Sequence, residues 1–373
     1  MSVQVSRIAL TNTLSWVARA LPTRSATPIL SGIHITVKEG VLRASAFDYE
    51  QSASGTLPVT GDNLDVIVNG RLFADVVRSL GGQDVKLELS EDENRLVVES
   101  GRSVFGLPLM PLSEYPDLPD VPPELGTVAG SSFCEAIKEV AIATGNDTSV
   151  PVLTSVLMIA DPEKGTLTMA ATDRYRLGFT TITYTPAEGV SEKKTFLIPA
   201  KALESYAKSF TDLETVTMHH GGDKNSLFGV TGDQNTATTR LFDGQFPNYE
   251  PLIPTSFFAI VDVPKDDLIA AVKRVILVTD RSQAVKFTFE EGAVVLSAGS
   301  ILSSAQSATE TVEIDYTSEE LVISFNPAFL LDGLANINTD NVRFRLVAAQ
   351  KPALLSTTND DDKYKYLLMP TRA

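Results

Sequence analysis

The side chains that most often carry catalysis are scarce and scattered in this sequence. The three histidines are His34, His219 and His220, and none stands at metal-ligand spacing from a carboxylate or a thiol. His219 and His220 are neighbours in a predicted strand, so they point to opposite faces. The single cysteine, Cys134, lies in a predicted helix with no histidine nearby in the sequence. We therefore predict no catalytic residues and no metal site.

Two further segments resemble phosphate or cation sites, and each has a simpler interpretation. Gly221-Gly222-Asp223-Lys224 lacks the spacing of a nucleotide-binding glycine loop and falls in a predicted hairpin turn. Asp360-Asp361-Asp362 precedes the last predicted strand and is typical of a solvated turn. No nucleotide or other cofactor is expected.

Composition limits the class of protein. The chain has 373 residues, 43% of them hydrophobic, which is enough for two or three domains of roughly 100–200 residues, each with its own core. No apolar stretch approaches the roughly 18 residues of a membrane span, and polar residues interrupt positions 1–21, so neither a membrane span nor a signal peptide is expected. One cysteine excludes an internal disulfide and fits a reducing cytoplasm.

A helix pattern recurs three times along the chain. It begins at Val68-Asn69-Gly70, Ile198-Pro199-Ala200 and Phe325-Asn326-Pro327, at offsets of 130 and 127 residues. Apolar residues then follow at spacings that place them on one helical face. They are Leu72, Phe73, Val76, Val77 and Leu80 in the first copy, Ala202, Leu203, Tyr206, Ala207 and Phe210 in the second, and Phe329, Leu330, Gly333, Leu334 and Ile337 in the third.

An earlier helix and several hairpins complete each repeat. Apolar residues spaced i, i+4, i+7 predict the earlier helix; they are Leu10, Leu14 and Val17, then Phe133, Ile137 and Val140, then Leu268, Val272 and Val275. Alternating segments around glycine turns, such as 33–46, 156–170 and 285–298, predict antiparallel strands. We predict an α+β fold of three tandem domains, 1–122, 127–254 and 255–373, each with two helices and two small antiparallel sheets.

Charge is distributed unevenly between the predicted helices and the rest of the chain. The net charge of −16 argues against a protein that grips nucleic acid by broad electrostatic attraction. The six helices, however, have a slight excess of positive charge. Helices of this kind suit a passage that attracts a polyanion only weakly. Among the basic residues on or beside them, nine are expected to face the polyanion: Arg19, Arg24, Arg71, Arg78, Lys138, Lys201, Lys208, Lys273 and Arg274.

Five segments carry a resemblance to a known family: 27–32 (TPILSG), 100–105 (SGRSVF), 171–177 (ATDRYRL), 243–249 (DGQFPNY) and 366–372 (YLLMPTR). In order and spacing the chain resembles the beta subunit of bacterial DNA polymerase III, the sliding clamp, along essentially its whole length. Three clamp domains form an arc in that family, and two arcs join head to tail into a ring around duplex DNA. The resemblance implies a cytoplasmic, nucleoid-associated homodimer that slides on DNA, confers processivity on a polymerase and catalyses nothing itself.

The resemblance also implies two contact surfaces. Phe105 and Leu107 of one copy would contact Ile276 and Leu277 of the other, with ordinary core packing as the alternative for all four. A hydrophobic cleft between the second and third domains would bind short linear motifs of the replicative polymerase alpha subunit, the clamp loader, other polymerases and repair proteins. Its residues would be Leu153, Thr172, Arg174, Tyr175, Arg176, Leu177, Pro247, Leu252, Leu367, Leu368, Met369, Pro370 and Arg372.

Some positions depart from the family pattern or allow another interpretation. Arg174 replaces a small residue, and Pro251 stands where some members have a basic one, so both bear on peptide preference. Arg24 matches a DNA-contacting arginine of the family, whereas segment 145–150 carries Asp147 and no aromatic. The apolar tail 367–370 is equally interpretable as the last strand of the third domain. A peptide-docking scaffold that never encircles DNA is the alternative function.

Overall fold

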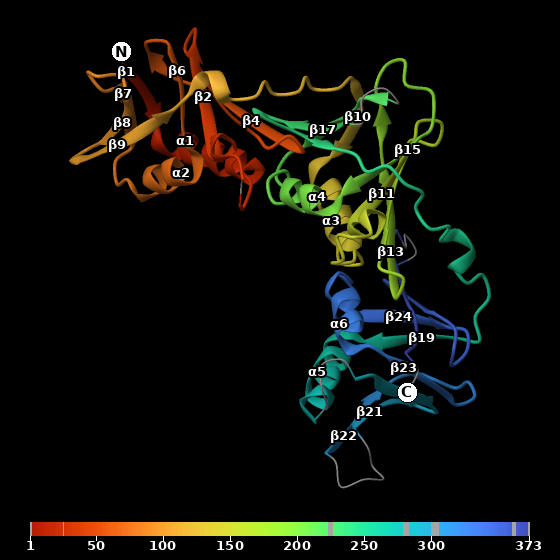
Figure 1. Cartoon of the computed structure of the whole chain (residues 1–373). Helices are drawn as coiled ribbons and strands as arrows, with labels where there is room; N and C mark the ends of the chain where they lie inside the picture. The colour runs from red at the N-terminus through yellow and green to blue at the C-terminus, as the bar shows by residue number, and fades with distance from the viewer. Residues whose placement is uncertain are drawn as a thin grey trace. The chain divides into compact units, whose positions relative to one another are not determined.

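The computed structural model describes residues 2–24, 26–222, 227–278, 283–299, 306–359 and 363–371, and Figure 1 shows its elements. The chain divides into two compact units. Unit 1 comprises Met1–Ser131, Thr185–Val190 and Ser205–Leu241, and unit 2 comprises Ser132–Tyr184, Ser191–Glu204 and Phe242–Ala373.

The order of elements repeats three times along the chain: a strand, a helix, several strands, a second helix and three more strands. The first repeat contains β1 (Ser2–Ser6), α1 (Arg7–Val17), η1 (Ala18–Ala20), η2 (Pro28–Ser31), β2 (Gly32–Lys38), β3 (Val41–Phe47), β4 (Gln51–Pro58), β5 (Thr60–Gly61), β6 (Leu64–Asn69), α2 (Gly70–Ser79), β7 (Asp84–Leu89), β8 (Arg95–Ser100), β9 (Ser103–Met110) and η3 (Leu112–Glu114).

The second and third repeats follow the same plan. The second contains β10 (Glu124–Ala129), α3 (Gly130–Ala141), η4 (Pro151–Thr154), β11 (Ser155–Asp161), β12 (Thr166–Thr172), β13 (Arg176–Thr183), β14 (Thr185–Pro186), β15 (Lys194–Pro199), α4 (Ala200–Ala207), β16 (Thr215–His220), β17 (Leu227–Gly232), β18 (Asn235–Arg240) and η6 (Glu250–Leu252). The third contains β19 (Ala259–Pro264), α5 (Lys265–Val275), η7 (Ile276–Val278), β20 (Val285–Glu290), β21 (Ala293–Gly299), β22 (Ser307–Glu313), β23 (Leu321–Phe325), α6 (Pro327–Ala335), β24 (Asn341–Leu346), β25 (Ala353–Ser356) and β26 (Lys365–Leu368).

The tandem α+β plan with two helices per repeat is thus confirmed, but each repeat also opens on a strand that the sequence analysis missed. These strands are β1, β10 and β19. Their alternation is short: Val3 and Val5 are buried in the first, and Val261 and Val263 in the third. With so few alternating residues, each strand merges in the sequence with the apolar start of the helix behind it.

Side-chain caps fix where two of the second helices begin. The Asn69 side chain accepts a hydrogen bond from the N–H of Leu72 at the start of α2, and Asn326 accepts from Ala328 and Phe329 at the start of α6. Such caps satisfy backbone donors that no helical carbonyl reaches. One residue of the predicted buried faces is misplaced: Leu72 is exposed, because the buried face of α2 centres on Phe73 and the residues one turn beyond it.

Strands of neighbouring repeats pair with each other, so the sheets are larger than the small sheets expected from the hairpins alone. In unit 1 a 14-stranded sheet runs β14-β10-β16-β17-β18-β4-β3-β2-β6-β9-β8-β7-β1-β5, and β18 pairs with β4 across the first two repeats. In unit 2 an 8-stranded sheet runs β15-β11-β12-β13-β26-β25-β24-β19, and β13 pairs with β26 across the last two. A 4-stranded sheet, β22-β21-β20-β23, completes unit 2.

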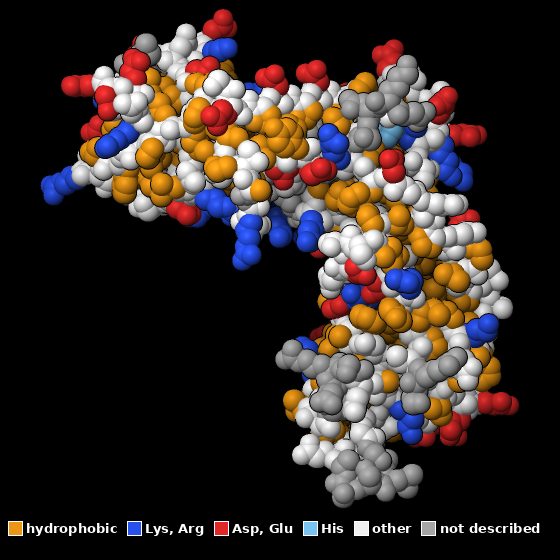
Figure 2. Space-filling view, viewed as in Figure 1, with side chains coloured by type: hydrophobic (Ala, Val, Ile, Leu, Met, Phe, Trp, Pro, Cys, Tyr) orange, Lys and Arg blue, Asp and Glu red, His pale blue; other side chains and the backbone are white. Residues whose placement is uncertain are grey.

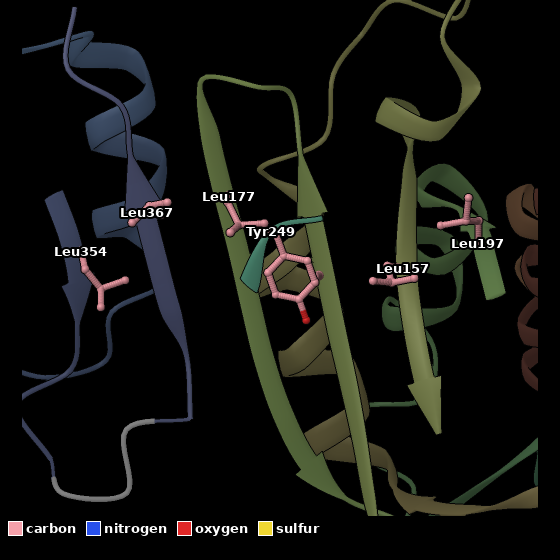
Figure 3. Packing of buried hydrophobic residues seen from close by; sticks show 7 residues of the cluster. Leu157, Leu177, Leu197, Tyr249, Leu354 and Leu367 are labelled. Atoms are coloured by element: carbon pink, nitrogen blue, oxygen red, sulfur yellow. The ribbon is translucent and has the colours of Figure 1, made fainter. Parts of the chain in front are cut away.

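Buried clusters cover these repeat-to-repeat junctions. In unit 1 the Trp16 ring packs against Tyr206 and Phe210, which lie in and just beyond α4. In unit 2 residues from the second and third repeats form one apolar cluster on the 8-stranded sheet (Figure 3). Its buried members are Leu157, Ala170, Leu177, Leu197, Tyr249, Leu354 and Leu367.

Candidate functional site

The turn between β12 and β13 is held by hydrogen bonds from its own side chains. Asp173 Oδ1 accepts hydrogen bonds from the N–H groups of Tyr175 at 2.9 Å and Arg176 at 3.0 Å. The Thr172 hydroxyl donates to the Arg176 carbonyl at 2.6 Å and accepts from the Arg174 N–H at 3.1 Å. Arg174 adopts a φ of 81°, a left-handed conformation that non-glycine residues rarely take. The turn therefore presents Arg174 and Tyr175 outward, and the Tyr175 side chain is 62% exposed.

The tail of the chain lies beside this turn. β26 pairs with β13 on one side and β25 on the other, so Leu367 and Leu368 are buried inside the 8-stranded sheet. Met369 then leaves the strand: its N–H donates to the Tyr175 carbonyl at 3.0 Å, and its side chain is partly exposed. The tail is thus a structural strand up to Leu368, followed by residues on the surface. The interpretation of the tail as the last strand of the third domain is thus confirmed up to Leu368, and the peptide-binding interpretation stays a prediction.

A third segment of unit 2 adds exposed apolar residues to the same region. Pro247 and Leu252 are exposed, and between them Tyr249 is buried in the cluster that holds Leu177 and Leu367 (Figure 3). The N–H of Leu252 donates to the Tyr249 carbonyl at 2.9 Å, which fixes Leu252 next to the cluster. Leu252 therefore stands beside the cluster, whereas Tyr175 and Met369 lie next to each other just outside β13 and β26, the strands that carry Leu177 and Leu367. Exposed apolar side chains of this kind suit aliphatic and aromatic anchors of a peptide.

The remaining expected cleft residues lie beneath or beyond this surface. Leu153 and Thr172 are buried, and Leu153 and Asp173 both lie beside Gly145. Pro370 is half-buried after Met369. Arg372 lies outside the described residues, as do Asp223, Lys224 and the run 360–362.

Arg176 is turned away from the surface. Its side chain is 9% exposed, its Nε lies 3.0 Å from Asp173 Oδ2, and its Nη1 lies 2.5 Å from Asp332 Oδ2. Its guanidinium carbon stands 4.4 Å from the centre of the Phe329 ring. Burial opposes the charge, but Tyr366 and the carboxylates of Asp332 and Asp173 raise the pKa of Arg176.

Sequence reasoning missed the partners of Arg176. The local sequence could have indicated Asp173, because an aspartate side chain often bonds backbone N–H groups that follow it in a turn. Asp332 is 156 residues away along the chain, and no local pattern connects it to Arg176.

Four of the basic residues expected to face DNA have protein partners. Arg19 is half-buried, donates to the Ser205 carbonyl at 2.6 Å and to the Ser209 hydroxyl, and burial lowers its pKa. Arg71 donates to the carbonyls of Leu21 and Pro22. Two more form ion pairs: Arg78 with Asp75 at 2.8 Å, and Arg274 with Glu310 through two bonds of 2.8 and 2.9 Å.

The other five expected DNA-facing residues are exposed and form no ion pair within the described ranges: Arg24, Lys138, Lys201, Lys208 and Lys273. Figure 2 shows Lys and Arg side chains gathered on the helix side of unit 1, while most of the acidic side chains of this unit visible in that view lie on its opposite edge. The asymmetry expected from the sequence therefore has a counterpart on the surface of this unit.

The residues expected at a contact between copies are unevenly exposed. Leu277 is 80% exposed, Phe105 is 38% exposed, and Ile276 is partly buried. Leu107 is buried in its own sheet at 4% exposure, so its side chain contributes to the core of the first repeat. Among the described strands, residues 103–108 of β9 pair only with β8, and β22 pairs only with β21, which leaves one open edge on each.

No group of three histidine, cysteine, aspartate or glutamate side chains in the described ranges is placed to hold a metal ion. None of the described helices is long and apolar enough to cross a membrane.

Three family models match the chain in order. They are the N-terminal, central and C-terminal domains of the DNA polymerase III beta subunit, at residues 1–119, 127–248 and 250–372. The chain belongs to the DNA polymerase III beta subunit family. The beta sliding clamp of Streptomyces coelicolor is 38% identical over 380 residues, which cover 100% of this chain and 99% of that protein. The beta sliding clamp homolog GriR of Streptomyces muensis is 34% identical, with coverage of 100% and 99%.

Solved structures of family members share the fold. The DNA polymerase III subunit beta of Pseudomonas aeruginosa matches with a TM-score of 0.90 and 25% identity, and the match covers 100% of both chains. A sliding clamp from the same organism, solved bound to griselimycin, matches with a TM-score of 0.90 and 26% identity over 100% of both chains. The tandem clamp-domain fold predicted from the sequence is confirmed, and so is the family's general function as a DNA sliding clamp that gives a polymerase its processivity.

Proposed function

We propose that two copies of the chain join head to tail into a ring that encloses duplex DNA, slides on it and tethers partner proteins through the cleft of unit 2. The observation that carries the proposal is the pair of open strand edges on β9 and β22. An exposed edge offers unpaired N–H and C=O groups to another chain. When one copy's β9 edge meets the other copy's β22 edge, the same contact forms twice and the assembly closes.

Apolar residues next to these edges support the same assembly. Phe105 lies on the open part of β9, and Leu277 stands in η7 behind α5, which is joined to β22 through the Arg274–Glu310 ion pair. A leucine that is 80% exposed is costly to leave in water and gains stability when a partner covers it. Leu107 is buried in the core of its own repeat and supports β9 from that side.

Weak attraction to DNA fits retention by enclosure. Arg24, Lys138, Lys201, Lys208 and Lys273 are exposed, whereas four other basic residues are committed to protein partners. A small set of exposed cations on a chain of net charge −16 gives loose phosphate contacts that salt weakens further. Loose contacts permit sliding, since the ring needs no grip to stay on the duplex.

The cleft is proposed to bind short linear motifs with leucine or aromatic anchors. Tyr175, Leu252 and Met369 provide the exposed apolar walls, and Leu177 and Leu367 provide the floor. The expected partners are the replicative polymerase alpha subunit, the clamp loader, other polymerases and repair proteins. The protein is proposed to act in the cytoplasm, on nucleoid DNA and without catalysis of its own, with domain boundaries at 1–122, 127–254 and 255–373.

The solution mass tests the ring. Sedimentation at micromolar concentration is expected to give twice the chain mass of 40.2 kDa. A chain that stays monomeric, both free and on DNA, contradicts the ring and leaves a peptide-docking scaffold as the function.

A further inference from the structure

Arg176 connects the two repeats that build the proposed cleft. It is the first residue of β13 and pairs in register with Leu368 of β26. From there its guanidinium reaches helix α6, where it contacts the Asp332 carboxylate at 2.5 Å and the Phe329 ring at 4.4 Å. Its Nε simultaneously bonds Asp173 at 3.0 Å within its own turn. One side chain therefore fastens the turn of the second repeat to a helix of the third.

Two of the three proposed walls of the cleft, Tyr175 and Met369, are connected to this fastening. The Tyr175 ring stacks on Phe329 with ring centres 6.2 Å apart, so the wall formed by Tyr175 rests on the helix that Arg176 holds. The Tyr175 carbonyl accepts the N–H of Met369 at 3.0 Å, so the Met369 wall is bound to the same turn. A shift of the turn relative to α6 would move Tyr175 and Met369 together.

Helix α6 is also fixed against the strand that carries the tail. The Tyr366 hydroxyl donates to the Phe329 carbonyl at 2.8 Å. A methyl group added at Gly333 would meet the Tyr366 ring at 2.4 Å, so the helix backbone lies directly on that ring. Helix α6 and strand β26 are thus fixed to each other, and the Arg176 guanidinium connects this pair to the turn through Asp332 and Asp173.

Charge explains why the tie needs a cation. The Asp173 side chain is 11% exposed, and Asp332 converges on the same guanidinium. Removal of Arg176 would leave the Asp173 carboxylate buried with no counter-charge, which is unfavourable, whereas the Asp332 side chain is 49% exposed and remains in contact with water. Without Arg176 the two carboxylates would repel each other, and moving the turn away from α6 would relieve the repulsion. Because both carboxylates and Phe329 already engage it, the guanidinium is not free to bind an acidic group of a peptide.

We propose that Arg176 is a positioning residue: it holds Tyr175 and Met369 together in the position beside α6 that receives a peptide, and it does so without contacting the peptide. The proposal rests on the peptide-binding function proposed for the cleft. It assigns Arg176 a place beneath the cleft wall, whereas the sequence analysis included it among the residues that bind the peptide.

The test compares four variants of the full chain: Arg176→Met, Arg176→Lys, Asp332→Asn and the double variant Arg176→Met/Asp332→Asn. Arg343→Met is the matched control, since Arg343 forms a two-bond pair with Asp262 in the same sheet but between β24 and β19. The affinity of a fluorescein-labelled peptide with leucine and phenylalanine anchors is measured by anisotropy well below the melting temperature. Amide exchange at Met369 is measured without peptide.

Arg176→Met is expected to weaken peptide affinity at least about tenfold, and Asp332→Asn about threefold or more. Lysine restores the charge but not the planar fork, so Arg176→Lys falls between Arg176→Met and the unaltered chain. The double variant is expected to be no weaker than Arg176→Met, because both changes remove the same tie. Exchange at Met369 accelerates in Arg176→Met and Asp332→Asn but not in Arg343→Met.

Three results overturn the proposal or its basis. If Arg176→Met weakens peptide affinity but Asp332→Asn leaves it unaltered, Arg176 contacts the peptide directly. Unaltered affinity in every variant shows no role for Arg176. If the unaltered chain binds no anchored peptide, the proposed cleft function fails. Amide exchange at Met369 still decides whether Arg176 ties the turn to α6, because unchanged exchange in the milder Arg176→Lys and Asp332→Asn variants refutes that tie.

Discussion

Replacing Leu277 by alanine is expected to open the proposed ring while leaving each chain folded. The side chain is 80% exposed in the single chain, so folding gains little from it. Covering it in a contact between copies removes that apolar surface from water, and losing its isopropyl group then costs about 2 kcal/mol per contact. A closed dimer contains this contact twice, so the loss is about 4 kcal/mol. The dimer dissociation constant should rise about a thousandfold.

Ile8→Ala is the matched control for this prediction. Ile8 is 63% exposed on α1 and lies outside the proposed contact, so its removal deletes a similar apolar surface without touching the ring closure. Mass photometry and sedimentation equilibrium across nanomolar to micromolar concentrations give the dimer fraction, and thermal unfolding checks the fold. If Leu277→Ala dissociates no more readily than Ile8→Ala, Leu277 is not in the contact and the proposed closure is wrong.

Two further predictions concern the cleft and the response of the fold to pH. Met369→Asp places a charge in the apolar wall, and deletion of residues 369–373 removes that wall but keeps the buried Leu368 of β26. Each change is expected to abolish binding of a polymerase-derived peptide while the dimer persists; undiminished affinity would locate the site elsewhere. Burial raises the pKa of Glu139 from its usual 4.5 to about 7, against a hydrogen bond from Thr180 that lowers it. Protonated Glu139 stabilises the folded chain fully below pH 4.5, and this stabilisation is lost as the pH rises through 7. From pH 5 to pH 8 the free energy of unfolding of the unaltered chain should therefore fall by about 2 kcal/mol relative to that of Glu139→Gln. Denaturant titrations at both pH values test this, and parallel pH dependence in the two proteins would contradict it.

The periodicity of apolar residues was sufficient to predict the helices and the hairpins from the sequence. The buried stripes Leu10, Leu14 and Val17 in α1 and Leu268, Val272 and Val275 in α5 lie where a period of 3.6 residues places them. Alternation likewise located the β2–β3 and β20–β21 hairpins, whose strands are neighbours in the chain.

Pairings between distant segments had no such signal. Alternation shows that a strand is half-buried but not which strand lies next to it, so the pairing of β4 with β18 and of β13 with β26 could not be predicted. The same limit applies to Arg19, whose acceptors Ser205 and Ser209 lie more than 180 residues away. A basic residue in a helix pattern is expected on the surface, and only the tertiary structure reveals that Arg19 is engaged within the protein.

Retention on circular DNA tests the central claim, enclosure of the duplex, most directly. The protein is loaded by a clamp loader onto nicked circular DNA, separated from free protein, and then the circle is cut at one site. We expect the protein to remain on the intact circle through the separation and to leave the DNA after cutting, since a ring slides off a free end. Continued binding to the linear product at the same salt concentration would show that contacts with the duplex hold the protein, and would contradict enclosure.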